Sequence, residues 1–569
     1  MRFAVFYLVF NMGQVIADHM NRFIRHYEPL HFLSEPSVLG ETARSEGSLE
    51  TSNSNIRFAA YGKTFHLLLR RDASLFAEDF AVLTPTGKVN SSIDHLHSGT
   101  LLGYSMSRVF GSVKGGVFEG YINTGDGTEY YVEPGWKYFG SNVSQYIIYS
   151  AADVLMPPDV TGTVSCGVDG MRNLAPEPRQ GLQRHKRQVD YIHFTGSPID
   201  DKHTKKPRKA TKESMAYRMC NLLITIDHTL YAHHSYGSAT DEEIRDRIVT
   251  VVASHVDAAS HIFSSTNFQG VSGIMFRVET LKVNTPKGCE GKARLGNPFC
   301  AEDLDANLIL EHFSNANYDL YCSAFIWTFR DFANGVLGLA YVGTPSTRVS
   351  GGICQKYAKL NFGGYHRSVT LNTGVVTFVN HGRAVPLRTS QLTFAHELGH
   401  SFGANHDKDK ICAPGGHDGN YIMYPTSNPG TLANNLKFSS CSIKDIGAVL
   451  DSILHERGGR GNCFLPSKDG FCGNNIREQK EECDCGNTDS DCDDKCCYAN
   501  HNKEQKMGCT LRPNAVCSPT SGACCTTNCR FRSHSHVCSP EDECNFASKC
   551  EYPPYHCAIC SPLCFKTIG

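Results

Sequence analysis

One short stretch, HELGHSFGANHD, brings together three histidines, a glutamate and a glycine at fixed offsets. On an α-helix His396 and His400 lie four residues apart on one face, where two imidazoles can bind one Zn²⁺. Gly403 can adopt the positive φ of a sharp turn, which lets His406 return as a third ligand. Three protein ligands leave a fourth position for water, the arrangement of a catalytic zinc. Glu397 can then act as general base on that water.

The length of this motif separates it from a chance match in a chain with 26 histidines. The core H-E-x-x-H alone is expected in roughly one random chain in twenty of this composition, and the full pattern in only a few per ten thousand. Downstream, GNYIMYP places Met423 in an expected tight turn. There its side chain would form an apolar floor beneath the metal, although without the histidine motif it would be taken for an ordinary core residue.

The composition indicates a multidomain globular protein of the secretory pathway. The chain has 569 residues and a net charge of −2, which gives no support for nucleic-acid binding. Arg2, the apolar run Phe3–Phe10 and small residues up to Ala17 predict a signal peptide, residues 1–17. A buried N-terminal strand is the alternative. No apolar run is long enough to span a bilayer.

The 26 cysteines are unevenly distributed. One, Cys166, lies in the first 219 residues, eight lie between Cys220 and Cys463, and seventeen lie between Cys472 and Cys564. This density predicts a disulfide framework formed in an oxidising compartment. A zinc ribbon is the competing interpretation, but paired C-x-x-C knuckles do not repeat.

Apolar patterning divides the chain. Residues 18–187 contain alternating segments such as KTFHLLLRR and GGVFEGYI, which predict a β-rich domain. Residues 211–465 mix strand-like and helix-like segments and predict an α/β domain. Beyond residue 466 the apolar periodicity disappears, and disulfides must hold the fold. Two N-x-S/T sequons, at Asn90 and Asn142, are candidate glycosylation sites.

Two helices of the α/β domain can be placed from their end signals. TDEEIRDRIVTVVASHVDAASHIF has helical apolar spacing, with Thr240 and Asp241 available as caps. TSQLTFAHELGHSFG predicts a helix that starts at a Ser390 cap and ends near Gly403.

A basic stretch lies between the first two domains. Residues 188–210 form a basic linker, and Arg184–Arg187 just before it match the preference of a furin-like proprotein convertase. We expect cleavage after Arg187, with a solvated linker as the alternative. A second basic cluster, KKPRK, follows within the linker.

With these residues in view, the chain resembles the adamalysin-type (ADAM) metalloproteases, most closely their Kuzbanian-type, α-secretase branch. The strings that carry the resemblance include FIRHYEPL, LLLRRDASLF, RDFANGVLGLAYVG, LNTGVVT, TFAHELGHSFGANHD, GNYIMY and EECDCG. Aspartate directly after the third histidine, Asp407, is the adamalysin form of the motif. The resemblance implies a β-rich prodomain and an α/β metzincin catalytic domain with a mixed five-stranded sheet, a zinc-binding helix and a Met-turn. It also implies a disulfide-rich disintegrin-like domain with little regular structure at 466–558, and the start of a cysteine-rich region at 559–569.

The resemblance assigns further residues. Gly338, Leu339 and Ala340 would form the edge strand along which a substrate lies extended. Cys166 would act as a cysteine switch that occupies the zinc in a latent proprotein, although an unpaired buried thiol is an equal reading of the residue by itself. In the catalytic domain the family pattern implies three disulfides, and the two cysteines left over are expected to pair locally: Cys220–Cys322, Cys354–Cys463, Cys412–Cys441 and Cys289–Cys300.

Clustered acids after residue 470 offer oxygen ligands. By resemblance, calcium could bind there in addition to the catalytic zinc, with Asn474, Glu478, Glu481 and Asp494 as candidates. A solvated acidic face is the plainer alternative. The chain has no RGD tripeptide, so integrin binding is unsupported.

The functional expectation is therefore a zinc endopeptidase that sheds ectodomains of membrane proteins, of the Notch and amyloid-precursor type by resemblance. A secreted matrix-degrading protease and an inactive adhesion module are the alternatives, and the intact histidines and Glu397 argue against the second. The sequence reaches Gly569 without the family's transmembrane helix. We expect the cell surface if the native chain continues into such a helix, and secretion otherwise.

Overall fold

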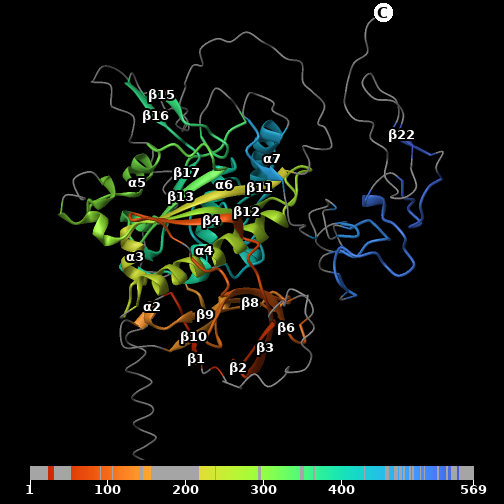
Figure 1. Ribbon diagram of the computed structural model, residues 1–569, viewed down its shortest axis with the longest axis horizontal. Coiled ribbons are helices and arrows are strands. Elements are labelled where there is room, and N and C mark those ends of the chain that lie inside the picture. Colours follow the sequence, from red (N-terminus) through yellow and green to blue (C-terminus); the bar gives the residue numbers. More distant parts are fainter. Residues whose placement is uncertain are drawn as a thin grey trace, which may run out of the picture.

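The protein is described by a computed structural model (Figure 1). It describes residues 23–30, 32, 53–89, 91–104, 107–139, 145–155, 217–237, 239–291, 297–345, 351–362, 365–428, 430–454 and 461–466, with shorter segments between 472 and 549. We refer to the described parts of 23–155, 217–466 and 472–549 as the N-terminal domain, the central domain and the C-terminal region. Figure 1 shows the N-terminal domain below the central domain, with the C-terminal region to one side.

The N-terminal domain is built on one antiparallel sheet with the strand order β1-β10-β9-β8-β7-β6-β3-β2. In β3 the alternate residues Phe65, Leu67 and Leu69 are buried, as expected for a strand with one solvated face. The elements are β1 (Glu28–Leu30), β2 (Asn53–Ala60), β3 (Lys63–Arg71), β6 (Leu96–Leu101), β7 (Arg108–Lys114), β8 (Val117–Asn123), β9 (Glu129–Pro134), α2 (Trp136–Phe139) and β10 (Tyr146–Ser150).

The central domain contributes five strands to a second sheet, in the order β14-β17-β13-β11-β12, where only β14 is antiparallel to its neighbour. The short β20 also pairs with β11. These strands are β11 (Tyr217–Ile226), β12 (Met275–Val283), β13 (Ser323–Thr328), β14 (Gly338–Ala340), β17 (Thr373–Thr377) and β20 (Leu465–Pro466).

The same sheet takes two strands from the N-terminal part of the chain, which the sequence did not indicate. β4 (Phe76–Thr84) pairs in parallel with the outer edge of β12, and β5 (Gly87–Val89) pairs antiparallel with β4. Val82 faces Leu281 in this register and is fully buried in the same core cluster as β12 and α4. The two domains therefore share a hydrophobic core.

Helices cover both faces of the central sheet. Buried side chains of α4 and α6 share a core cluster with one face, while Ile309 and Leu310 of α5 pack on Ala324 and Ile326 of β13 at the other. The helices are α3 (His228–His234), α4 (Asp241–Ser264), α5 (Ala306–Phe313), α6 (Leu387–Ser401) and α7 (Ser440–Leu454). Smaller elements are β15 (Ala358–Phe362), β16 (Tyr365–Val369), β18 (Val379–Asn380) and β19 (Arg383–Ala384), and short 3-10 turns at Ala151–Asp153, Pro286–Cys289, Pro298–Cys300, Ala333–Gly335 and Gly416–Asp418.

The cap expected from the sequence is confirmed at the start of α4 but not at the start of α6. Thr240 and Glu243 form a complete capping box at the start of α4. The expectation that Ser390 caps α6 was wrong, because the helix begins at Leu387, one turn earlier. The Ser390 hydroxyl lies inside the helix and is 2.9 Å from Nε2 of the buried His255 on α4.

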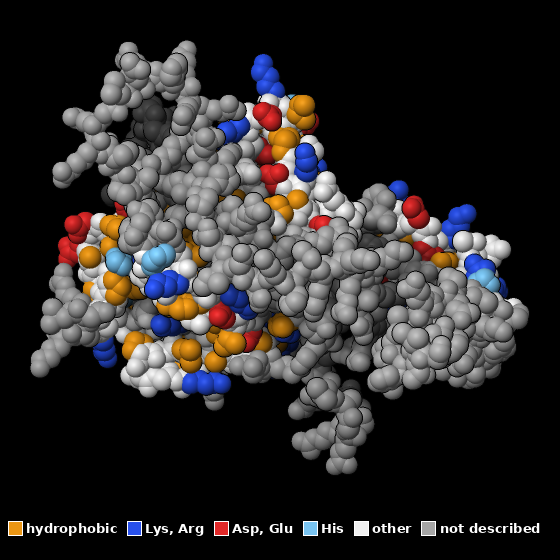
Figure 2. Space-filling view, turned by 90° about the horizontal axis from the view of Figure 1, so that it is seen from above, with side chains coloured by type: hydrophobic (Ala, Val, Ile, Leu, Met, Phe, Trp, Pro, Cys, Tyr) orange, Lys and Arg blue, Asp and Glu red, His pale blue; other side chains and the backbone are white. Residues whose placement is uncertain are grey.

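Regular structure in the described C-terminal region is limited to β21 (Val537–Ser539), β22 (Ser548–Lys549) and a 3-10 turn at Pro519–Ser521. Five disulfides join pairs of cysteines that are both described in it: Cys472–Cys509, Cys483–Cys497, Cys485–Cys492, Cys496–Cys529 and Cys517–Cys525. None of the helices in the described parts of the chain has the length and apolar character needed to cross a bilayer. On the face shown in Figure 2, described acidic and basic side chains are interspersed, in keeping with a net charge of −2.

Candidate active site

The three histidines of the motif converge at the end of α6. Their ligand-type nitrogens all lie within 4.8 Å of one another, and the Nε2 atoms of His400 and His406 are 3.2 Å apart. His396 and His400 lie on the helix, which ends at Ser401, and Gly403 follows two residues later with a φ of +113°. A Cβ at Gly403 would lie 2.5 Å from Cγ2 of Val449, so a glycine is required where the chain turns back to His406.

The hydrogen bonds of the imidazoles prepare them to bind a metal. Nδ1 of His396 lies 2.7 Å from the carbonyl oxygen of Ile422, and Nδ1 of His400 lies 2.8 Å from that of Ala404. A carbonyl accepts only, so each Nδ1 carries the proton and each Nε2 keeps its lone pair. Burial lowers the pKa of His396 to about 4 and that of His400 well below its usual value, so both rings are neutral at pH 7.

A metal ion fits this donor set. Nε2 of His396 is buried and has no hydrogen-bond partner in the protein, although a buried nitrogen of this kind normally has one. Three imidazoles around one point are one of the ligand sets of catalytic zinc.

Met423 and Asp407 support the site from below. Met423 is fully buried, and a Cβ at Gly399 would lie 2.4 Å from its sulfur, so the methionine packs directly against the helix between His396 and His400. The Asp407 amide donates to the Met423 carbonyl oxygen at 2.9 Å. The Asp407 carboxylate accepts hydrogen bonds from Ser439 and Ser442 at 2.6 and 3.1 Å, and burial raises its pKa to about 6. Asp407 thereby connects the turn after His406 to the start of α7.

Glu397 is 1% exposed and lies against the edge strand β14. A Cβ placed at Gly338 would come within 2.5 Å of the Glu397 carboxylate oxygen Oε1. Next to these two residues is a pocket whose walls include Leu337, Leu392 and Ile422 and the segment Tyr424–Asn428. The site therefore combines a three-imidazole centre, one buried carboxylate, an edge strand and a pocket with both apolar and polar walls.

This close approach gives a prediction for Gly338→Ala. The added methyl group must displace the Glu397 carboxylate, since the backbone of β14 is fixed by its pairing with β17. We expect kcat on a peptide substrate to fall about 100-fold, while zinc content by elemental analysis stays at one ion per chain. Gly461→Ala is the matched control, because a Cβ there would meet no atom within 4 Å; an unchanged kcat for Gly338→Ala would contradict the assigned position of the carboxylate.

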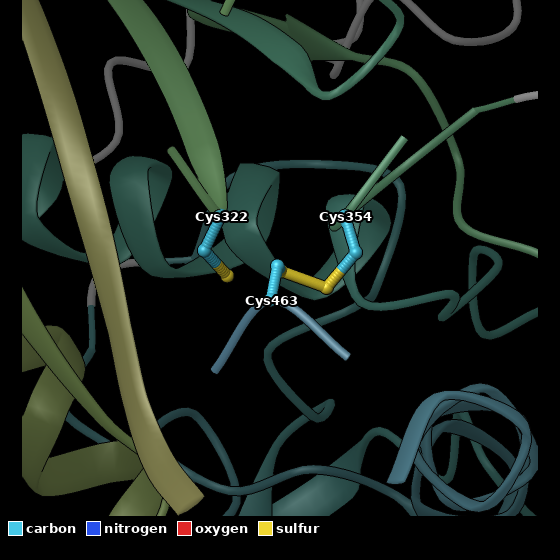
Figure 3. Close-up of side chains that lie close together, drawn as sticks. All are labelled: Cys322, Cys354 and Cys463. Atoms are coloured by element: carbon cyan, nitrogen blue, oxygen red, sulfur yellow. A yellow bond between two sulfur atoms is a disulfide. The ribbon is translucent and has the colours of Figure 1, made fainter. Parts of the chain in front are cut away.

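The structure contains four central-domain disulfides. Three are the pairs that the resemblance implies, Cys220–Cys322, Cys354–Cys463 and Cys412–Cys441, and the fourth joins the two remaining cysteines, Cys289 and Cys300. Figure 3 shows the Cys322 sulfur pointing toward the Cys354–Cys463 bridge. Sulfur atoms of these three residues lie within 4.8 Å of one another. Two disulfides thus fix the starts of β11 and β13 next to the segment that leaves the central domain.

Other residues singled out in the sequence lie outside the described residues: Cys166, Arg187, Asn90, Asn142, Asn474 and Glu478. Of the remaining calcium candidates, Asp494 is buried and accepts hydrogen bonds from the Cys496 amide and the Ser518 and Thr520 hydroxyls. The described part of the chain shows Glu481 in a group with Cys472 and Cys509, not with Asp494.

Sequence reasoning missed the contacts that the N-terminal domain makes with the start of α6. The Leu387 amide donates to the Glu133 carboxylate and lies 3.2 Å from the Tyr149 hydroxyl, so residues of β9 and β10 cap the helix. Arg388, the next residue, pairs with Glu129. No local signal marks these residues, because they lie more than 200 positions from α6.

Comparison with known proteins agrees with this site. A model of the metallo-peptidase family M12B, reprolysin-like, matches residues 244–452, and a disintegrin model matches residues 478–559. Together with the three-histidine centre, these matches define a metalloendopeptidase with a disintegrin domain.

The most informative relatives cover nearly the whole chain. The Caenorhabditis elegans homologue of disintegrin and metalloproteinase domain-containing protein 10 is 34% identical over 98% of this chain. The Bos taurus and Mus musculus proteins of that name are 36% and 35% identical over 94%. The chain belongs to this family. It spans 65% of the length of the nematode protein and 69% of the bovine and mouse proteins.

Proposed function

We propose that this chain is a zinc-dependent endopeptidase, made as a latent proprotein, that cleaves the extracellular domains of membrane proteins near the membrane. The observation that carries the proposal is the buried Glu397 carboxylate, placed between three converging imidazoles and the edge strand β14. Identity of 34–36% to one family over most of the chain supports the shedding role, with Notch- and amyloid-precursor-type substrates.

The substrate would lie extended along Gly338, Leu339 and Ala340. β14 is the last strand of its sheet, and its inner edge is the one paired with β17. A peptide added to the outer edge would gain main-chain hydrogen bonds, which are independent of side-chain identity, and one apolar side chain would enter the neighbouring pocket. This mode of binding selects substrate segments that are extended and accessible, and it imposes few requirements on their sequence.

Glu397 would carry the proton transfers. A bound zinc ion, held by His396, His400 and His406, supplies Lewis-acid chemistry: it lowers the pKa of water and polarises a carbonyl. The Glu397 carboxylate takes a proton from the attacking water and afterwards delivers it to the leaving amine. The pocket and β14 would hold the scissile bond in place, and burial of Glu397 keeps bulk water away from its carboxylate.

Cleavage of a quenched peptide with a juxtamembrane sequence tests the proposal. The processed chain is expected to cut the peptide, to lose this activity with a zinc chelator and to regain it when zinc is added back. Activity that survives complete removal of the metal would refute the zinc mechanism, and the absence of any cleavage by a zinc-loaded, processed chain would refute the protease.

Latency would be imposed by Cys166, whose thiolate is a suitable zinc ligand. We predict that Cys166→Ala in the unprocessed chain raises basal peptidase activity above wild type when the site at Arg187 is blocked by Arg187→Ala. The same assay on Arg187→Ala alone is the control. Equal activities of the two chains would remove the cysteine switch.

The remaining assignments complete the proposal. Residues 1–17 would be removed as a signal peptide, 18–187 would be the prodomain, cut after Arg187 by a furin-like convertase, and 211–465 and 466–558 the protease and disintegrin-like domains. Asn90 and Asn142 would carry glycans. The enzyme would pass through the secretory pathway and act at the cell surface if the native chain continues into a transmembrane helix, or as a secreted protein otherwise. Calcium at Asn474, Glu478, Glu481 and Asp494 stays a prediction, and at Asp494 it competes with the hydroxyl donors already in place.

A further inference from the structure

Arg388 is a buried cation between the N-terminal domain and the substrate pocket. It lies in the first turn of α6 and is only 6% exposed. On one side its Nη1 contacts the Glu129 carboxylate at 2.5 Å and the Tyr131 hydroxyl at 3.0 Å, both on β9. On the other side its Nη2 donates to the carbonyl oxygen of Gly430 at 2.6 Å.

The second contact leads directly to the pocket wall. The Gly430 amide donates to the side-chain oxygen of Asn428 at 3.1 Å, and Asn428 lines the pocket together with Leu392. A Cβ at Gly430 would lie 2.4 Å from Arg388 Nε and 2.7 Å from Leu392 Cδ1. Gly430 has a φ of +75°, so only a glycine allows the segment to sit this close to the guanidinium.

The hydrogen bond from Arg388 to Gly430 matters because the buried guanidinium carries a positive charge. A guanidinium removed from water must find acceptors, and its hydrogen bonds are about twice as strong as those between neutral groups. When the N-terminal domain leaves, Glu129 and Tyr131 leave with it. The Gly430 carbonyl is then the acceptor of Arg388 that belongs to the central domain itself.

We propose that Arg388 is a positioning residue for substrate selection. It holds the pocket wall against α6 through Gly430 and Asn428, and it links the N-terminal domain to that wall. The proposal rests on the proposed peptidase function and deepens it. In the unprocessed chain Glu129 and Tyr131 hold Nη1 of Arg388, while Nη2 binds Gly430. In the processed enzyme Arg388 stays bound to Gly430 and determines which side chains the pocket accepts.

Hydrogen exchange of the unprocessed full chain tests whether Arg388 holds the pocket wall in place, and this test does not depend on peptidase activity. In Arg388→Met we expect the amide hydrogens of a peptide covering 426–432 to exchange about tenfold faster than in wild type, with unchanged exchange in the rest of α6. Arg388→Lys keeps a charged donor and is expected to restore part of the protection. Unchanged exchange at 426–432, or equal acceleration along all of α6, would overturn the positioning role.

The substrate selectivity of the processed enzyme tests whether Arg388 affects which side chains the pocket accepts. Two quenched peptides that differ only by Leu or Ala at the residue entering the pocket are compared. For Arg388→Met the ratio of kcat/KM for the Leu and Ala peptides is expected to fall about tenfold, through KM of the Leu peptide, with zinc content unchanged. Glu129→Gln is the matched control, because Glu129 belongs to the N-terminal domain and is absent from the processed enzyme. The ratio of kcat/KM for the two peptides is therefore expected to equal that of wild type.

The outcomes separate this inference from the function on which it rests. Wild-type enzyme that cuts neither peptide would refute the peptidase, while the exchange data still decide whether Arg388 holds the wall. Proportional loss on both peptides in Arg388→Met, or a changed ratio in Glu129→Gln, would overturn the role in selection.

Discussion

Replacing Glu397 by glutamine is expected to abolish peptidase activity while leaving the protein folded and loaded with zinc. Glutamine has nearly the same shape as glutamate, so it fits the space against Gly338. It cannot accept a proton at neutral pH, and the general-base step is lost. Loss of such a step lowers kcat by about 10²–10⁴-fold.

The measurement is kcat on a quenched peptide together with zinc content and the thermal unfolding midpoint. His396 and His400 keep their backbone hydrogen bonds in this variant, so zinc binding and stability should equal those of wild type. His400→Ala is the contrasting variant, in which zinc and activity should be lost together. Near-wild-type kcat in Glu397→Gln would show that another group takes the proton.

Val82→Asp is expected to prevent folding of the whole chain, not only of its N-terminal domain. Val82 is fully buried on β4 in the core that also contains α4 and β12. An unpaired carboxylate buried at this position costs about 3–5 kcal/mol, a large part of the free energy of unfolding of a typical domain. We expect secretion of the chain to fall strongly and the surviving protein to bind little zinc.

Leu83→Asp is the matched control, because Leu83 is the next residue of the same strand and its side chain is 37% exposed. The amount of secreted protein and its protease resistance compare the two variants. If Val82→Asp and Leu83→Asp behave alike, the strand contributes nothing to the central core.

The elements that could be predicted from the sequence are those determined by nearby residues. The capping box at Thr240 and Glu243 has its two partners three residues apart, and α4 starts there. The histidine motif has its ligands on a single helix and the turn after it, so spacing alone brings His396, His400 and His406 together. Alternation along KTFHLLLRR likewise predicts β3 over the same nine residues.

The features that could not be predicted depend on groups far away in the sequence. Ser390 satisfies the local rule for a helix cap, but Glu133 and Tyr149 supply the cap one turn earlier, and the Ser390 hydroxyl is next to His255 instead. Residues 76–84 (FAEDFAVLT) do not alternate between apolar and polar side chains, and nothing in them indicates that β4 joins the sheet of the central domain. The role of Arg388 is hidden for the same reason, since none of its partners is local.

The parallel pairing of β4 with β12 sets an order of events during biosynthesis. β4 leaves the ribosome long before β12 exists, so this edge of the sheet closes only after the central domain has been made, and such long-range pairing is slow. Until then the polypeptide between them acts as a tether that keeps β4 at a high effective concentration near its partner. A cut at Arg187 before closure would release that tether and turn an intramolecular step into an encounter between two dilute fragments. If a convertase cleaves at Arg187 as proposed, the fold requires that it act late, on a chain whose central sheet is already complete.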